Sequence, residues 1–241
     1  MIPAAPETAD TLAGLAPTED YIIDEHLNNM YEIDAARVAR LLPSPLSPKE
    51  PRPGTAIINI GYMKFDATHI GGLADTIELT FSIIIHPDLA LDMPMPRISV
   101  FDLQIASNCP VFLAHEDEYQ KLNGMHLPGL ARELQAPGHL RVWDDAGPIL
   151  EFRNPNLSPI YKYEYATGQY VSDHPSGLHQ GVFSWEGIGC EQQPVGDCGR
   201  LYSHRFYQDI DVGWVGDCYL QMFLATPGQA LFRSFNTRRL R

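Results

Sequence analysis

The chain has 241 residues, of which 44% are hydrophobic and 20% charged, and its formal net charge is −13. This length can bury a substantial core in one large domain or two small ones. The acidic balance argues against a nucleic-acid-binding surface, which needs clustered Lys and Arg side chains. The N-terminal stretch lacks the pattern of a signal peptide, and no apolar run approaches the ~18 residues that cross a bilayer. We therefore expect a cytoplasmic protein without nucleic-acid or membrane partners.

An N-terminal arm over residues 1–20 precedes the first predicted element, because this stretch is rich in Ala, Pro, Thr and acidic residues. A short helix is predicted over 34–42, where Asp34 can cap the free N–H groups and apolar residues share one face. The proline-rich segment 43–54 ends this helix, because proline removes a hydrogen-bond donor and fixes φ.

Strand patterns dominate the rest of the chain. Long apolar runs rich in β-branched residues predict strands that are covered on both faces. The predicted strands cover 55–63, 76–86, 97–107, 139–143, 148–153, 160–171, 181–186, 203–214 and 218–225. A helical segment is predicted over about 115–135, and the basic residues 233–241 are expected to form a solvated tail. Because the sequence has no internal repeat, residues 21–241 are expected to form a single β-rich α+β domain.

Three parts of the chain carry motifs in a distinctive order. The residues YEID precede the short helix, and LLPSPLSPKEPRPG, an apolar strand and a Gly-Gly turn follow it. Further along lie RISVFDLQIASNCPVFLAHED and, near the end, YQDIDVGWVGDCYLQMF. This order resembles the acetoacetate decarboxylase-like superfamily. The resemblance implies a mostly antiparallel β cone or barrel with a central cavity and a few peripheral helices, homo-oligomers, and small keto-acid substrates.

The lysine chemistry of that family does not carry over to this sequence. In the family, a lysine forms a Schiff base with the substrate carbonyl, and a neighbouring lysine and an apolar cavity lower its pKa. The family's Gly-x-Pro-Lys-Lys element falls on residues 126–130, where Gly129 and Leu130 replace the two lysines. The four lysines of the chain are Lys49, Lys64, Lys121 and Lys162. The resemblance thus implies a divergent member without the Schiff-base lysine pair.

The resemblance also implies positions that contact the substrate. The family's arginine before the Tyr-x-x-Asp element falls near Asp24, whose charge has the wrong sign to bind a carboxylate. Its two cavity glutamates fall near Asn59 and Thr76, and Glu78 lies two residues beyond the second position. The expected substrate-binding residues are Gly129, Asn59, Thr76, Glu78 and His69.

Acid–base chemistry on a carbonyl compound needs a base near the operating pH and a donor for the developing enolate. His115, Glu116 and His126 bracket the family's catalytic helix, and a histidine–carboxylate couple in an apolar pocket suits this work. At the exit of the first predicted strand, Tyr62 can donate to an oxyanion and Lys64 is a candidate amine. Two structural alternatives stay open: a solvated, acidic helix start for the first group, and a surface loop with an ion pair for the second.

No cofactor and no bound metal are expected. The sequence contains neither a GxGxxG fingerprint nor a Walker loop. The spacings Asp66-x-x-His69 and His174-x4-His179 match neither the helical HExxH pattern nor a cysteine-pair site. The expected partners are therefore a small-molecule substrate and further copies of the chain.

These observations favour a lyase or isomerase that acts on a small keto or enol carboxylic compound by acid–base catalysis, without a Schiff-base lysine. Three alternatives remain. The protein can be a true β-keto-acid decarboxylase that uses a relocated lysine, with Lys64 or Lys121 first in line. It can be a non-catalytic protein that binds a small ligand in its cavity. It can also be a hydratase or cyclase of a biosynthetic or aromatic-degradation pathway.

Overall fold

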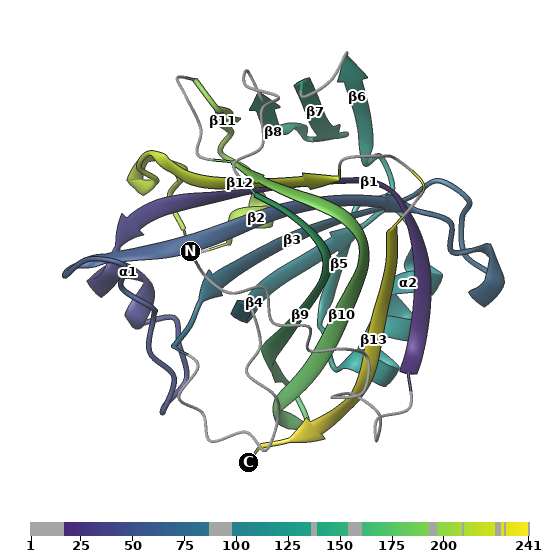
Figure 1. Ribbon diagram of the computed structural model, residues 1–241, viewed down its shortest axis with the longest axis horizontal. Helices are drawn as coiled ribbons and strands as arrows, with labels where there is room; N and C mark the ends of the chain where they lie inside the picture. The colour runs from purple at the N-terminus through teal and green to yellow at the C-terminus, as the bar shows by residue number, and fades with distance from the viewer. Residues whose placement is uncertain are drawn as a thin grey trace.

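A long, strongly curved sheet encloses the interior of the protein (Figure 1). The computed structural model describes residues 17–86, 98–135, 139–153, 161–192, 197–208, 210–224, 228 and 230–240. The strands of this sheet are β1 (Pro17–Asp34), β2 (Thr55–Phe65), β3 (Thr76–Ile84), β4 (Ile98–Ser107), β5 (Gly124–His126), β9 (Tyr161–His174), β10 (Gly177–Gln192), β12 (Cys218–Leu224) and β13 (Ala230–Arg239).

The sheet closes into a barrel because its two ends pair with each other. The hydrogen-bonded order runs β1-β13-β10-β9-β4-β3-β2, and β2 pairs back onto β1. Strand β4 is parallel to both β5 and β9, whereas the other pairs are antiparallel. Closure removes the open edges that would otherwise invite association. The prediction of a mostly antiparallel, β-rich barrel with few peripheral helices is confirmed.

A second, smaller sheet packs on the outside of the barrel. It contains β6 (Ala131–Gln135), β7 (His139–Asp144), β8 (Gly147–Arg153) and β11 (Gly199–Leu201), and it lies beside β1, β2 and β12 in Figure 1. Apolar side chains of this sheet, such as Leu140 and Phe152, are buried in one cluster with Ile58 and Ile60 of β2. Burial of each such side chain contributes about 1.5–3 kcal/mol. The side chains on the outer face of β2 are therefore buried under the second sheet, and those on its inner face lie inside the barrel.

The helices are short and lie outside the barrel. Asp34 precedes α1 (Ala35–Ala39), and its Oδ1 accepts a hydrogen bond of 3.1 Å from the Arg37 N–H, as the sequence predicted. Pro110 begins α2 (Pro110–His115), and a π-helical turn, η3 (Glu116–Gln120), continues it. A third short segment, η2 (Thr68–Ile70), follows β2. None of the helices in the described parts of the chain is long and apolar enough to cross a membrane.

Four local predictions were wrong, in whole or in part. The helix over about 115–135 ends at Gln120, and the following residues form β5 and β6 because β5 completes a parallel ladder with β4. Segment 203–214 contains the 3-10 turns η4 (Arg205–Tyr207) and η5 (Val212–Trp214) instead of a strand. Tail residues 233–239 belong to β13, and residues 17–20 of the expected arm belong to β1.

The basic C-terminal residues join the sheet because neighbouring strands supply their partners. Arg233 of β13 pairs with Asp20 of β1 at 3.1 Å and with Glu186 of β10 at 2.6 Å. Arg238 donates a hydrogen bond of 2.8 Å to Gln180. Local sequence indicated a solvated tail, but pairing between distant strands decided the outcome.

Candidate functional site

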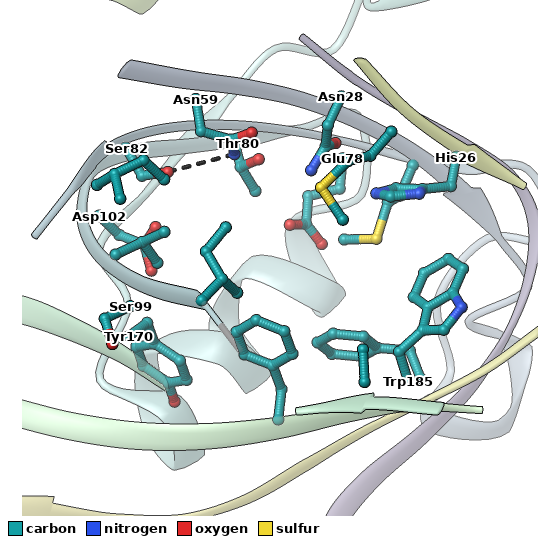
Figure 2. A pocket seen from close by; sticks show the side chains of 18 of the residues that line it. His26, Asn28, Asn59, Glu78, Thr80, Ser82, Ser99, Asp102, Tyr170 and Trp185 are labelled. Carbon is teal, nitrogen blue, oxygen red and sulfur yellow. Dashed lines mark hydrogen bonds between the residues drawn. The ribbon is translucent and has the colours of Figure 1, made fainter. Parts of the chain in front are cut away.

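The barrel contains a cavity of about 540 Å³, whose wall is mainly apolar (Figure 2). The inner faces of β1–β4, β9, β10, β12 and β13 contribute to it, and the side chains of Glu116, Gln120 and Leu122 also line it. A volume of this size lies within the range of about 300–1,000 Å³ that is typical of ligand-binding pockets. The described cavity is therefore the leading candidate for the functional site.

Strand alternation decides which residues of β2 face the cavity. Ile57, Asn59 and Met63 line it, because alternate side chains of a strand point to the same face. The intervening residues, including Ile60 and Tyr62, belong to the outer cluster. A shift of one residue along β2 therefore moves a side chain from the cavity to the space under the second sheet.

Two irregularities change this parity in neighbouring strands. In β1, the register shifts between Ile23 and Glu25, and the cavity-facing residues change from odd to even numbers, so that His26 points inward. In β4, the pairing with β3 shifts near Asp102, and the lining continues at Ile105. Such bulges re-aim side chains. The irregularity in β1 thus turns His26 towards the cavity. Asp102 keeps the inward parity of Ile98 and Val100, and the shift in β4 re-aims Ile105.

Three titratable side chains from three strands of the barrel line the cavity: His26 of β1, Glu78 of β3 and Asp102 of β4. Figure 2 shows the Glu78 carboxyl group pointing into the open space between His26 and Asp102. Glu116 also lines the cavity and is buried. Carboxyl groups beside an imidazole in an apolar enclosure can exchange protons with a bound compound.

Asp102 is suited to proton transfer near neutral pH. Burial among apolar strands raises the pKa of Asp102 to about 7. The residue as a whole is half-buried, and it lines both the main cavity and a second hollow of about 460 Å³. A group with a pKa near the working pH can both accept and release a proton.

His26 is neutral at physiological pH. Burial lowers its pKa to about 4, although the nearby Asn28 side chain opposes this shift. Its ring packs against Trp185 with a centroid distance of 4.6 Å. Its Nδ1 atom is buried, and none of the described residues supplies a hydrogen-bond partner for it. A neutral imidazole can donate a hydrogen bond to a developing enolate without introducing a charge.

Three of the expected site residues lie in the cavity wall. These are Glu116, from the expected catalytic set, and Asn59 and Glu78, from the expected substrate-binding set. The Asn59 amide donates a hydrogen bond of 3.4 Å to the Ser82 hydroxyl, which holds it against β3. All three positions come from the family resemblance.

Three others lie on β2 or β3 away from the cavity. The Tyr62 hydroxyl faces the outer side of β2 and donates to Glu25 Oε2 at 2.7 Å. Lys64 Nζ forms ion pairs of 2.9 Å with both Asp24 and Asp75. Thr76 begins β3, and its hydroxyl donates to the backbone oxygen of Leu73 at 2.8 Å.

The remaining expected residues also lie outside the wall formed by the described residues. His126 is exposed on β5, and His69 is exposed on η2. The ring of His115 packs against Tyr119, with centroids 4.5 Å apart. A side chain at Gly129 would collide with the carboxylate of Asp145. Gly129 thus permits a close approach between a turn and its neighbour, and it does not enlarge the cavity.

Sequence reasoning missed His26 and Asp102. Asp102 stands alone in the apolar run VFDLQI, and an unpaired acid in a buried strand is an available signal of function. His26 lies in the mixed segment DEHLNNMYE, which carries no comparable signal. Its inward orientation depends on the irregularity in β1.

The described lysines do not offer an amine inside the cavity. Lys49 lines the cavity but is exposed, and Lys121 Nζ donates to the backbone oxygen of Glu118 at 2.7 Å. The Lys162 side chain lies outside the described residues. Among the residues that the structure describes, no three His, Cys, Asp or Glu side chains form a metal-binding group.

No protein-family model and no curated protein matches the chain. Solved structures do match it. An acetoacetate decarboxylase is similar with a TM-score of 0.61 and 10% identity, over 96% of this chain and 97% of the other. Acetoacetate decarboxylase from Legionella pneumophila gives 0.60 and 10% identity, over 98% and 91%. The enduracididine biosynthesis enzyme MppR, complexed with pyruvate, gives 0.59 and 10% identity, over 94% and 92%. This chain therefore has the acetoacetate decarboxylase-like fold.

Proposed function

We propose that the protein is a cofactor-independent lyase or isomerase that acts on a small keto or enol compound by acid–base catalysis. The observation that supports this proposal is the convergence of Glu78, Asp102 and His26 on one largely apolar cavity. Because Gly129 and Leu130 replace the family's lysine pair, the proposed mechanism uses no Schiff base.

In this mechanism the Asp102 carboxylate removes a proton from the carbon next to the substrate carbonyl. The neutral His26 imidazole donates a hydrogen bond to the oxygen that becomes negatively charged. Return of the proton to a different carbon gives an isomerase, and loss of a leaving group from the enolate gives a lyase. Glu78 is the second carboxyl group available for the return of the proton. A positioned base of this kind contributes about 10²–10⁴-fold in rate.

The structural neighbour MppR is consistent with carbonyl chemistry in such a cavity. It is seen complexed with the condensation product of pyruvate and imidazole 4-carboxaldehyde, at a TM-score of 0.52 to this chain. At 10% identity this likeness extends only to the fold. The proposal therefore depends on the side chains of this chain and not on those of MppR.

Exchange of α-protons provides a test that requires no knowledge of the natural substrate. The ketone 4-phenylbutan-2-one is incubated in D2O with the protein, and loss of its α-proton signals is followed by NMR. We expect acceleration by the wild type and at least about a 100-fold loss of this acceleration in Asp102→Asn. The control is Glu133→Gln, at an exposed position on β6 of the outer sheet, which should exchange at the wild-type rate. Equal exchange by wild type and Asp102→Asn would refute the mechanism.

Borohydride trapping tests the alternative lysine chemistry. Reduction in the presence of ketones should leave all four lysines unmodified by mass spectrometry. An adduct on Lys49, Lys64, Lys121 or Lys162 would instead support a decarboxylase with a relocated lysine. Binding of the ketone without any exchange would favour the second candidate, a ligand-binding protein, for which the cavity volume is the supporting observation.

A further inference from the structure

We propose that the cavity takes an uncharged carbonyl compound with a bulky apolar substituent, in place of the carboxylic acid that the family resemblance implies. This inference rests on the proposed function, because it assumes that the described cavity is the substrate site. Its evidence is the size of the cavity, the nature of its walls and the sign of its charges.

Size and wall chemistry indicate a bulky apolar group. The cavity of about 540 Å³ matches drug-sized ligands, and a four-carbon keto acid would leave most of it unfilled. Aromatic side chains form much of its wall, among them Tyr21, Phe65, Phe183 and Trp185. Figure 2 shows the Trp185 ring next to His26 in the cavity wall. Such walls gain free energy from apolar contact and gain nothing from a small, fully hydrated anion.

The charges that line the cavity disfavour a carboxylate. Four described lining residues are acidic: Glu78, Asp102, Glu116 and Glu191. The only lysine or arginine among the described lining residues is Lys49, whose side chain is exposed. His26 is neutral, because burial lowers its pKa to about 4. A substrate carboxylate would lose its hydration and meet charges of its own sign in surroundings of low dielectric constant.

An ammonium ligand is also disfavoured, because it would pair with the carboxylate groups that must accept the proton. An uncharged ketone or enol leaves Asp102 free to act as the base and lets His26 bind the carbonyl oxygen.

Three probes with a common phenylalkyl frame distinguish these ligand classes. They are 4-phenylbutan-2-one, 4-phenylbutanoate and 4-phenylbutylamine, and their binding at pH 7.5 is measured by calorimetry. We expect the ketone to bind at least about tenfold more tightly than either charged probe. Glu78→Gln should reduce the preference for ketone over carboxylate by at least about tenfold, because it removes a like charge. The matched control Glu133→Gln, at an exposed position on β6 of the outer sheet, should leave this preference unchanged.

Thr80→Phe tests the location of binding. Thr80 lines the cavity on β3, so a phenyl ring there should fill it and abolish binding of the ketone, with circular dichroism reporting that the variant folds. Should that variant fail to fold, Ala166→Leu, at a lining position on β9, provides the same test.

Several results would overturn the inference. They are tighter binding of the carboxylate or the amine than of the ketone, no binding of the ketone, or an unchanged preference in Glu78→Gln. Ketone binding that persists in both folded filling variants would also overturn it. Preferred binding of the ketone without α-proton exchange would refute the proposed function and leave the ligand class standing. Faster α-proton exchange of a carboxylate probe than of the ketone would refute the ligand class and leave the proposed function standing.

Discussion

Replacing Asp102 by asparagine should stabilise the protein at alkaline pH, because this carboxyl group is more costly to ionise in the folded chain than in water. Burial raises its pKa from an ordinary 3.8 to about 7. A shift of this size corresponds to about 4 kcal/mol of folding free energy. Because the folded pKa is the higher one, the folded state binds more protons between these two values. The contribution of this carboxyl group to the free energy of unfolding is therefore fully present below pH 3.8. It falls as the pH rises and is lost above about pH 7.

Urea unfolding of wild type and Asp102→Asn at pH 4 and pH 8 measures this effect. Asparagine has nearly the same shape but does not ionise. We therefore expect similar free energies of unfolding at pH 4, and an advantage of up to about 4 kcal/mol for the variant at pH 8. An Asp102→Asn protein that is equally or less stable at pH 8 would refute the argument.

Two further predictions concern the outer sheet. Burial opposes ionisation of Glu151, but hydrogen bonds from Arg153, His139 and Tyr202 outweigh it and lower the pKa of Glu151 to about 2. The advantage of wild type over Glu151→Gln should thus be full above about pH 4.5 and shrink as the pH falls towards 2, which urea titrations at pH 7 and 2.5 can check. Alanine at Gly199 would meet the backbone oxygen of Glu151 and adopt a φ of 108°, so Gly199→Ala should lose about 2–3 kcal/mol. Gly54→Ala, where φ is 78° but the space is open, should cost only about 1–2 kcal/mol in thermal unfolding, and equal losses would contradict the collision.

Functional sites often contain an ionisable group that lowers the stability of the folded protein. An apolar or amide side chain at position 102 would satisfy the fold better than a carboxyl group does. The same reasoning does not apply to Glu151, whose partners stabilise its charge. The contrast between these two buried acids separates a candidate catalytic group from a structural one.

Local sequence determined much of the barrel wall. The apolar runs that became β2, β3 and β4 were predicted within about three residues of their observed ends, because each buries apolar side chains on both faces. The cap of α1 was predicted as well, because Asp34 and the Arg37 N–H lie within one turn. Strands β1 and β13 were not predicted as strands at all. Their polar and basic residues gain partners only when distant strands meet, as Arg233 does with Glu186.

The site shows the same division more sharply. Asn59 and Tyr62 are three residues apart, so they point to opposite faces of a regular strand and cannot both enter one cavity. The spacing in the sequence by itself determines this. It also determined that no two of the four lysines are adjacent in the chain. Only the tertiary structure decided that His26 and Asp102 face the same cavity as Glu78. The physical reason is that a register irregularity in β1 turns His26 inward, whereas pairing with β3 and β9 decides which face of β4, and with it Asp102, lies inside the barrel.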